Sequence, residues 1–76
     1  MITELDTVVL TRSIPEDGLL AGDLGAVVHV YANMEACEVE FVTGTGHTLA
    51  VLTLPMDAVR PLQDAEILHA RPLVAA

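Results

Sequence analysis

The acidic residues of this 76-residue chain are the first candidates for chemistry, and Glu38 and Glu40 form the most regular pair. They alternate with apolar residues, so we expect them on one face of a β-strand, about 7 Å apart. Two carboxylates can act as general acid and general base when a pocket shifts their pKa values. An exposed strand offers no such pocket, and we interpret both as solubilising residues. No nucleophile, base and orienting group can be assembled from the sequence, which predicts that the protein is not an enzyme.

Three histidines and one cysteine are the candidate metal ligands, namely His29, His47, His69 and Cys37. Their spacing matches neither Cys-x-x-Cys nor His-x₃-His, the short spacings that indicate zinc. Cys37 shares the apolar side of its strand with Val39 and Phe41, which favours a buried free thiol that packs as a small hydrophobic side chain. The glycines within residues 18–25 lack the Gly-Lys-Ser/Thr of a phosphate-binding loop. We therefore expect no metal and no cofactor, and the sequence gives no indication of a small-molecule ligand.

The charge is strongly acidic, with eleven Asp and Glu residues, three arginines, no lysine and a formal net charge of −8. Binding to a phosphate backbone depends on Lys and Arg, and only 3% of the residues are aromatic rings that could stack on bases. Both observations argue against nucleic acid as a partner. The acidity either keeps the protein soluble or steers it toward a basic partner.

Length and hydropathy predict one small domain. A single cysteine excludes an intrachain disulfide. The first residues are acidic where a secretory signal would be basic and then apolar, and no apolar run approaches the ~20 residues that span a bilayer. We expect a cytoplasmic protein that does not interact with a membrane.

Alternating residues predict an all-β fold over residues 1–62, a small five-stranded SH3-like barrel with one 3₁₀ turn before the last strand. The predicted strands cover residues 5–12, 26–32, 36–42, 48–54 and 60–62, and the turn falls within 56–59. The strand at 36–42 has the cleanest period, and it places Cys37, Val39 and Phe41 inward. The strand at 26–32 is expected to turn Ala26, Val28, Val30 and Ala32 inward. Residues 63–76 form a C-terminal tail that can hold a short helix at 64–68, ended by Pro72.

The strand at 48–54 is apolar on both faces, so one of these faces must be shielded from solvent by another segment or another protein. We expect Leu52 and Leu54 on the face that a lone barrel exposes, joined by Val27, Tyr31 and Val42. Two covers are possible. Either the C-terminal tail folds back over this strip, or the strip contacts a second copy or a different protein, because contiguous apolar patches usually mark contact sites.

Four segments together resemble a known family: Glu-Leu-Asp-Thr-Val-Val-Leu-Thr (4–11), Gly-Asp-Leu-Gly-Ala-Val-Val-His-Val-Tyr (22–31), Glu-Val-Glu-Phe-Val (38–42), and Val-Leu-Thr-Leu (51–54) leading to Arg60-Pro61. Over residues 2–62 the chain is similar to an uncharacterised bacterial family, domain of unknown function 4926. The resemblance implies an SH3-like fold and no established activity. Some members are encoded beside another small protein, as antitoxin or immunity partners are.

The Gly-Asp-x-Gly-x-Val-Val segment is also similar to the KOW motif of ribosomal and transcription proteins, which often contacts RNA or protein. A basic KOW loop carries Lys or Arg, whereas residues 22–33 carry Asp23 and no basic Lys or Arg side chain. A KOW-like nucleic-acid binder is therefore the weakest alternative.

These observations favour a protein-interaction module that binds another protein or itself. Its most specific form is the antitoxin or immunity partner of an adjacent small protein, and the alternative is a structural protein that assembles into a homo-oligomer. We expect Glu38 and Glu40 to steer a partner and six residues to contact it, namely Tyr31, Val42, Leu52, Leu54, Ile67 and Leu68.

Overall fold

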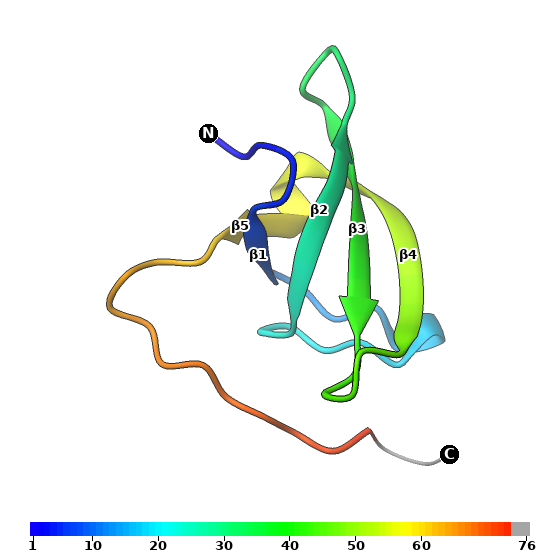
Figure 1. Ribbon diagram of the computed structural model, residues 1–76. Helices are drawn as coiled ribbons and strands as arrows, with labels where there is room; N and C mark the ends of the chain where they lie inside the picture. The colour runs from blue at the N-terminus through cyan, green and yellow to red at the C-terminus, as the bar shows by residue number, and fades with distance from the viewer. Residues whose placement is uncertain (74–76) are drawn as a thin grey trace.

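A computed structural model describes residues 1–73, which form one open antiparallel sheet of five strands (Figure 1). The strands are β1 (Thr7–Leu10), β2 (Leu24–Val30), β3 (Ala36–Val42), β4 (Thr48–Pro55) and β5 (Val59–Pro61), in the spatial order β4-β3-β2-β1-β5. Two 3₁₀ turns, η1 (Pro15–Asp17) and η2 (Met56–Ala58), complete the regular structure. The predicted all-β class and the turn before the last strand are confirmed. Within residues 1–73 no helix is long and apolar enough to cross a membrane.

The third strand forms at the predicted residues, because its alternation is uninterrupted. Cys37, Val39 and Phe41 are each at most 2% exposed, whereas Glu38 and Glu40 lie on the opposite face. β1 is shorter than the predicted 5–12. Leu5 has a φ of +73°, which an extended strand does not allow, so the strand starts only at Thr7.

The predicted inward face of the second strand is wrong. Val27 is fully buried opposite Val39, and Val28 is 41% exposed. The strand begins at Leu24, and the pairing register with β3 shifts between Val27 and His29, so Val28 is an extra residue. Such a bulge breaks the period of two that the prediction assumed. Val30, one of the four residues predicted to point inward, does pack partly against the core.

The predicted exposure of Leu52 and Leu54 is also wrong. Leu54 lies opposite Cys37 and is 8% exposed, and Leu52 lies opposite Val39 and packs against the core. Residues directly opposite each other in an antiparallel pair share a face, so the buried face of β3 dictates which β4 residues turn inward. The large apolar residues that β4 leaves exposed are Leu49 and Val51 instead.

The core lies on the concave side of the sheet and consists of small aliphatic side chains, one cysteine and one phenylalanine. Its buried members are Val8, Leu10, Leu19, Val27, Cys37, Val39, Phe41, Leu54, Ala58 and Val59. Gly25 lets β2 approach β3 closely here, because a β-carbon at this position would lie 2.4 Å from Val39 Cγ1 and 2.9 Å from Phe41 Cε1.

The C-terminal tail runs beside the sheet without regular secondary structure up to residue 73, and the predicted helix at 64–68 is wrong (Figure 1). A turn forms instead, in which the Glu66 backbone N–H donates to the Gln63 carbonyl. The Glu66 carboxylate accepts hydrogen bonds from the Gln63 N–H and from Arg60. These interactions compete with a helical hydrogen-bonding pattern. Residues 74–76 of the predicted tail lie outside the described residues.

Candidate functional site

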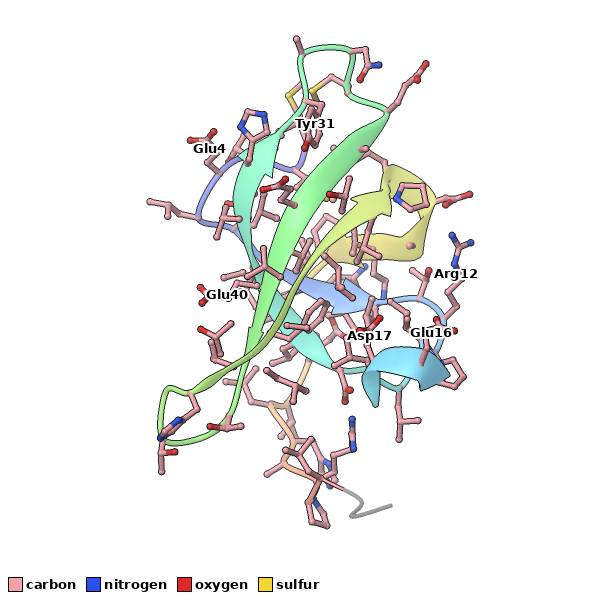
Figure 2. The ribbon with its side chains drawn as sticks, turned by 90° about the vertical axis from the view of Figure 1, so that its right-hand side faces the viewer. Glu4, Arg12, Glu16, Asp17, Tyr31 and Glu40 are labelled. Atoms are coloured by element: carbon pink, nitrogen blue, oxygen red, sulfur yellow. The ribbon has the colours of Figure 1, made fainter. Side chains whose placement is uncertain are left out.

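Four of the predicted contact residues lie on the outward face of β2, β3 and β4. Tyr31 follows β2, and its hydroxyl donates a hydrogen bond of 2.9 Å to Glu38 Oε1. This bond, and burial to a smaller extent, raises the pKa of the Tyr31 hydroxyl. The His29 ring meets the Tyr31 ring edge-on at a centroid distance of 4.7 Å, and Glu4 Oε2 lies 3.6 Å from His29 Nδ1. Glu4 and Tyr31 lie near the same end of the sheet (Figure 2).

Glu40 is the second outward carboxylate on β3, and it accepts a hydrogen bond of 2.6 Å from the Thr48 hydroxyl. It lies opposite Ala26 on one side and Val51 on the other. Glu38 and Glu40 thus each have a neutral hydroxyl partner, and neither lines either of the two cavities described below. The pair places two carboxylates on the outward face of β3.

An apolar strip lies beside this face, along β4 and the end of β3, where the register shift between Phe41 and Val42 leaves Leu49 without a cross-strand partner. It consists of Val42, Leu49 and Val51, which are 54%, 40% and 52% exposed. β4 is an edge strand of eight residues, paired with β3 alone, and it carries no charged side chain. Natural proteins usually protect such an edge with charges or prolines. The strip is therefore the surface of β4 that most needs a partner.

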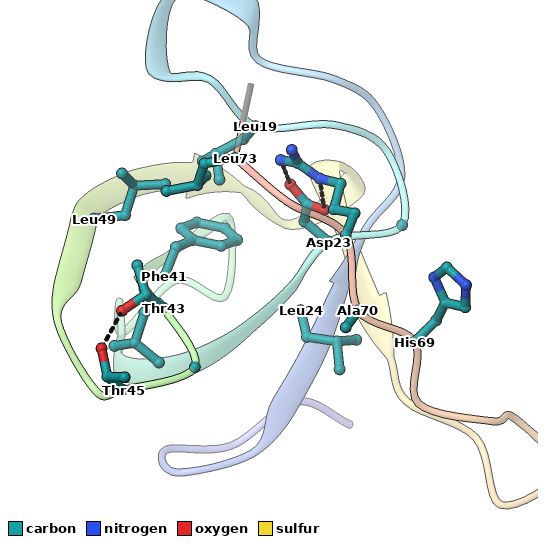
Figure 3. A pocket seen from close by; sticks show the side chains of 14 residues that line it. Leu19, Asp23, Leu24, Phe41, Thr43, Thr45, Leu49, His69, Ala70 and Leu73 are labelled. Carbon is teal, nitrogen blue, oxygen red and sulfur yellow. Dashed lines mark hydrogen bonds and ion pairs between the residues drawn. The ribbon is translucent and has the colours of Figure 1, made fainter. Parts of the chain in front are cut away.

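A cavity of about 560 Å³ lies between the sheet and the C-terminal tail, and Val42 and Leu49 of the strip line it (Figure 3). Apolar side chains line most of it, from the sheet and its loops and from the tail: Leu19, Leu24, Phe41, Val42, Leu49 and Leu73. Thr43 and Thr45, whose hydroxyls are 3.3 Å apart, lie at the β3–β4 loop. We call this cavity the groove.

An arginine of the tail spans one side of the groove. Arg71 Nε donates to Asp23 Oδ1 at 2.8 Å, and Arg71 Nη2 donates both to Asp23 Oδ2 and to the Gly18 carbonyl, the latter at 3.0 Å. The Leu20 backbone N–H also donates to Asp23 Oδ2 and fixes the carboxylate. The hydrogen bonds from Arg71, assisted by Leu20 N–H, hold the pKa of Asp23 below its ordinary value against the effect of burial.

The two predicted contact residues of the tail lie elsewhere. Ile67 and Leu68 are 92% and 66% exposed, and they border a smaller cavity of about 130 Å³ that β1 and β5 residues such as Val9 and Arg60 also line. The predicted contact set is thus separated into three places. Tyr31, Glu38, Glu40 and Val42 lie on the outward face, Leu52 and Leu54 face the core, and Ile67 and Leu68 lie on the tail.

Sequence reasoning missed Asp23, Leu49, Val51 and Arg71 as candidate site residues. A signal for Arg71 was present, because three arginines among eleven acidic residues are each expected to find a carboxylate. The choice of Asp23, 48 residues away, depends on the path of the tail. The sequence also marked Cys37, which is buried, and burial raises the pKa of its thiol. Among residues 1–73 no three His, Cys, Asp or Glu side chains are grouped to hold a metal ion.

The ion pair between Arg60 and Glu66 predicts a pH dependence of stability. Two hydrogen bonds from Arg60, of 2.8 and 2.7 Å, and one from the Gln63 N–H lower the pKa of Glu66 from 4.5 to about 2. A carboxyl whose pKa is lowered by folding stabilises the fold above its unfolded pKa and loses this effect as the pH falls. We expect the difference in unfolding free energy between wild type and Glu66→Gln to shrink from pH 4.5 to pH 2. An NMR titration in which Glu66 protonates near pH 4.5 would contradict this pairing.

Comparisons with known proteins identify the sequence family and leave the activity open. No curated protein and no solved structure matches the chain. Residues 4–61, which include all five strands, match the family described as domain of unknown function. The predicted resemblance over residues 2–62 is confirmed with nearly the same bounds. The chain therefore belongs to the domain of unknown function (DUF4926) family.

Proposed function

We propose that this protein is a non-enzymatic protein-interaction module that binds its partner through the apolar strip of Val42, Leu49 and Val51. The observation that carries the proposal is the exposure of these three side chains on and beside an uncharged edge strand. Apolar contacts at the centre of an interface supply most of the binding free energy, and the surrounding polar residues add specificity. The strip, bordered by Glu40 and Thr48, has this arrangement.

The charge of the chain defines the class of partner. A net charge of −8, with Glu38 and Glu40 beside the strip, accelerates association with a basic protein and disfavours an acidic one. An antitoxin or immunity role toward a basic small protein is the most specific form of the proposal. The proposal places the complex in the cytoplasm, where the free thiol of Cys37 stays reduced.

We also propose that the sheet is of the SH3-like type. Its support is the strand order β4-β3-β2-β1-β5 together with the single 3₁₀ turn that links β4 to β5. Proton–proton contacts measured by NMR test this assignment, and a pairing of β5 with a strand other than β1 would overturn it.

Replacing Val51 with arginine tests the strip. Val51 lies opposite Glu40, so the new cation gains an opposite charge across the strands and the fold tolerates it. The same cation interrupts the apolar surface and repels a basic partner. We expect tagged wild-type protein to recover one stoichiometric partner from a lysate of its native cells, and Val51→Arg to recover at least tenfold less.

Thr7→Arg is the matched control for this experiment. Thr7 is exposed on β1 and lies opposite Ala26, in the same cross-strand row as Val51 but three strands away. Wild-type recovery by Thr7→Arg, together with loss by Val51→Arg, assigns the contact to the strip. Equal recovery by both variants would refute that assignment.

Self-assembly is the second candidate, favoured by the free edge of β4. An uncharged edge strand of eight residues can pair with the same strand of a second copy. Light scattering over a hundredfold range of concentration separates the two functions. A mass that doubles in wild type and stays monomeric in Val51→Arg supports the homo-oligomer, whereas a monomer throughout supports a different partner.

A further inference from the structure

The tail contributes one charged and one aliphatic side chain to the groove, Arg71 and Leu73. Arg71 forms two hydrogen bonds with the Asp23 carboxylate and one with the Gly18 carbonyl, and both charged side chains are at least three-quarters buried. Two residues later, Leu73 lines the same groove as Leu19, Phe41 and Leu49 (Figure 3). The groove thus accepts an arginine at one end and an aliphatic side chain at the other.

Most residues that line the groove belong to the domain that the family shares, whereas the tail segment that lies along it does not. The part of the chain that matches the family, residues 4–61, contains Asp23, Phe41 and Leu49, which line the groove. It also contains Gly18, whose carbonyl accepts a hydrogen bond from Arg71. Arg71 and Leu73 lie outside that part. The family domain therefore supplies the sheet side of the groove, and the tail forms its other wall with His69, Ala70, Arg71 and Leu73.

The tail fills the groove incompletely. Leu73 remains 52% exposed and about 560 Å³ stays open beside it. This volume is within the range of about 300–1,000 Å³ that binding pockets have in proteins. The tail between residues 66 and 73 has no regular secondary structure, so its displacement breaks no strand or helix hydrogen bonds.

We propose that the groove binds a linear segment of a partner protein in which an arginine is followed two residues later by an aliphatic side chain. Residues 71–73 occupy the groove as an intramolecular competitor with the same chemistry. The arginine pairs with Asp23, and the aliphatic side chain packs on Leu19, Phe41 and Leu49. This inference deepens the proposed function, because it names the class of segment that an acidic interaction module recognises next to its apolar strip.

Competition by the tail has a measurable consequence. A tethered segment acts at an effective concentration in the millimolar range, so a free peptide of equal affinity cannot displace it at micromolar concentration. Replacing Arg71 with alanine removes the anchoring side chain and leaves Asp23 free. The full-length Arg71→Ala chain is therefore the protein in which the groove can be probed directly.

The probe is a fluorescein-labelled peptide, Leu-His-Ala-Arg-Pro-Leu, which copies residues 68–73, and the readout is fluorescence anisotropy. We expect Arg71→Ala to bind this peptide at least tenfold more tightly than wild type. A peptide with alanine in place of its arginine is expected to lose at least tenfold in affinity for Arg71→Ala. Equal binding of the two peptides, or equal binding to wild type and Arg71→Ala, would overturn the proposal.

The second variant, Arg71→Ala combined with Asp23→Asn, tests the acceptor. Asparagine retains an oxygen for the Leu20 N–H, so the turn is maintained while the negative charge is lost. We expect this double variant to lose at least tenfold in peptide affinity with a circular dichroism spectrum like that of Arg71→Ala. Unchanged affinity would show that the arginine binds elsewhere and would overturn the site.

Two further outcomes separate this inference from its alternatives. Val51 does not line the groove, so Val51→Arg combined with Arg71→Ala is expected to bind the peptide normally, even if the strip proves to have no partner. Light scattering of wild type and Arg71→Ala is expected to give monomers. A dimer of wild type that Arg71→Ala dissociates would assign the groove to the tail of a second copy, against our proposal.

Discussion

Replacing Leu54 with aspartate is expected to destabilise the fold by about 4 kcal/mol or more, because it places a carboxylate in the core without a partner. Leu54 is 8% exposed, lies opposite Cys37 and belongs to the main hydrophobic cluster. A domain of this length is stable by on the order of 4–11 kcal/mol, so the variant is expected to lose at least about a third of its unfolding free energy. Far-UV circular dichroism and urea titration measure the loss.

Leu54→Met is the matched control, since it keeps the volume and the apolar character of the side chain and is expected to cost less than about 1.5 kcal/mol. The comparison decides whether Leu54 is a core residue or a contact residue. Leu54→Asp protein that unfolds cooperatively at nearly the wild-type urea concentration would place the side chain at the surface, where sequence analysis expected it.

Replacing Gly25 with alanine is expected to cost about 3 kcal/mol, at the upper end of what overpacking a core usually costs. The new β-carbon would lie 2.4 Å from Val39 Cγ1, 2.9 Å from Phe41 Cε1 and 3.2 Å from the Glu40 carbonyl oxygen. Neither buried side chain can move into solvent, so β2 must shift away from β3. Urea unfolding followed by circular dichroism gives the change in free energy.

A double-mutant cycle with Val39→Ala identifies the cause. Val39→Ala alone leaves a cavity and destabilises the fold, but it also removes the Cγ1 atom that the alanine at position 25 would meet. We expect the double variant to cost at least about 1 kcal/mol less than the sum of the two single variants. Additive costs would exclude a clash between these positions. Gly44→Ala is the control, because nothing lies within 4 Å of its added β-carbon, and it should change stability by less than about 0.5 kcal/mol.

The prediction of strands succeeded where alternation was uninterrupted and failed where one residue changed the period. β3 could be predicted to the residue, because every second side chain between Cys37 and Phe41 is apolar and buried. In β2 the extra residue Val28 interrupts the alternation of inward and outward side chains, and a bulge depends on pairing with β3, which a single strand does not encode. In β4 both faces are apolar, so Leu52 and Leu54 could be assigned only from their partners Val39 and Cys37.

The candidate site likewise has one part that the sequence predicted and one part that only the structure showed. The sequence determined that the chain is acidic, all-β and rich in apolar side chains, and it predicted Glu38, Glu40 and Val42 on one face, because composition and local periodicity fix these properties. Only the tertiary structure decided that Leu49 and Val51 complete the strip and that Arg71 reaches Asp23. The reason is physical. An ion pair across 48 residues depends on the path of a tail that has no periodicity to read, and the exposure of an edge strand depends on which neighbours the sheet places beside it.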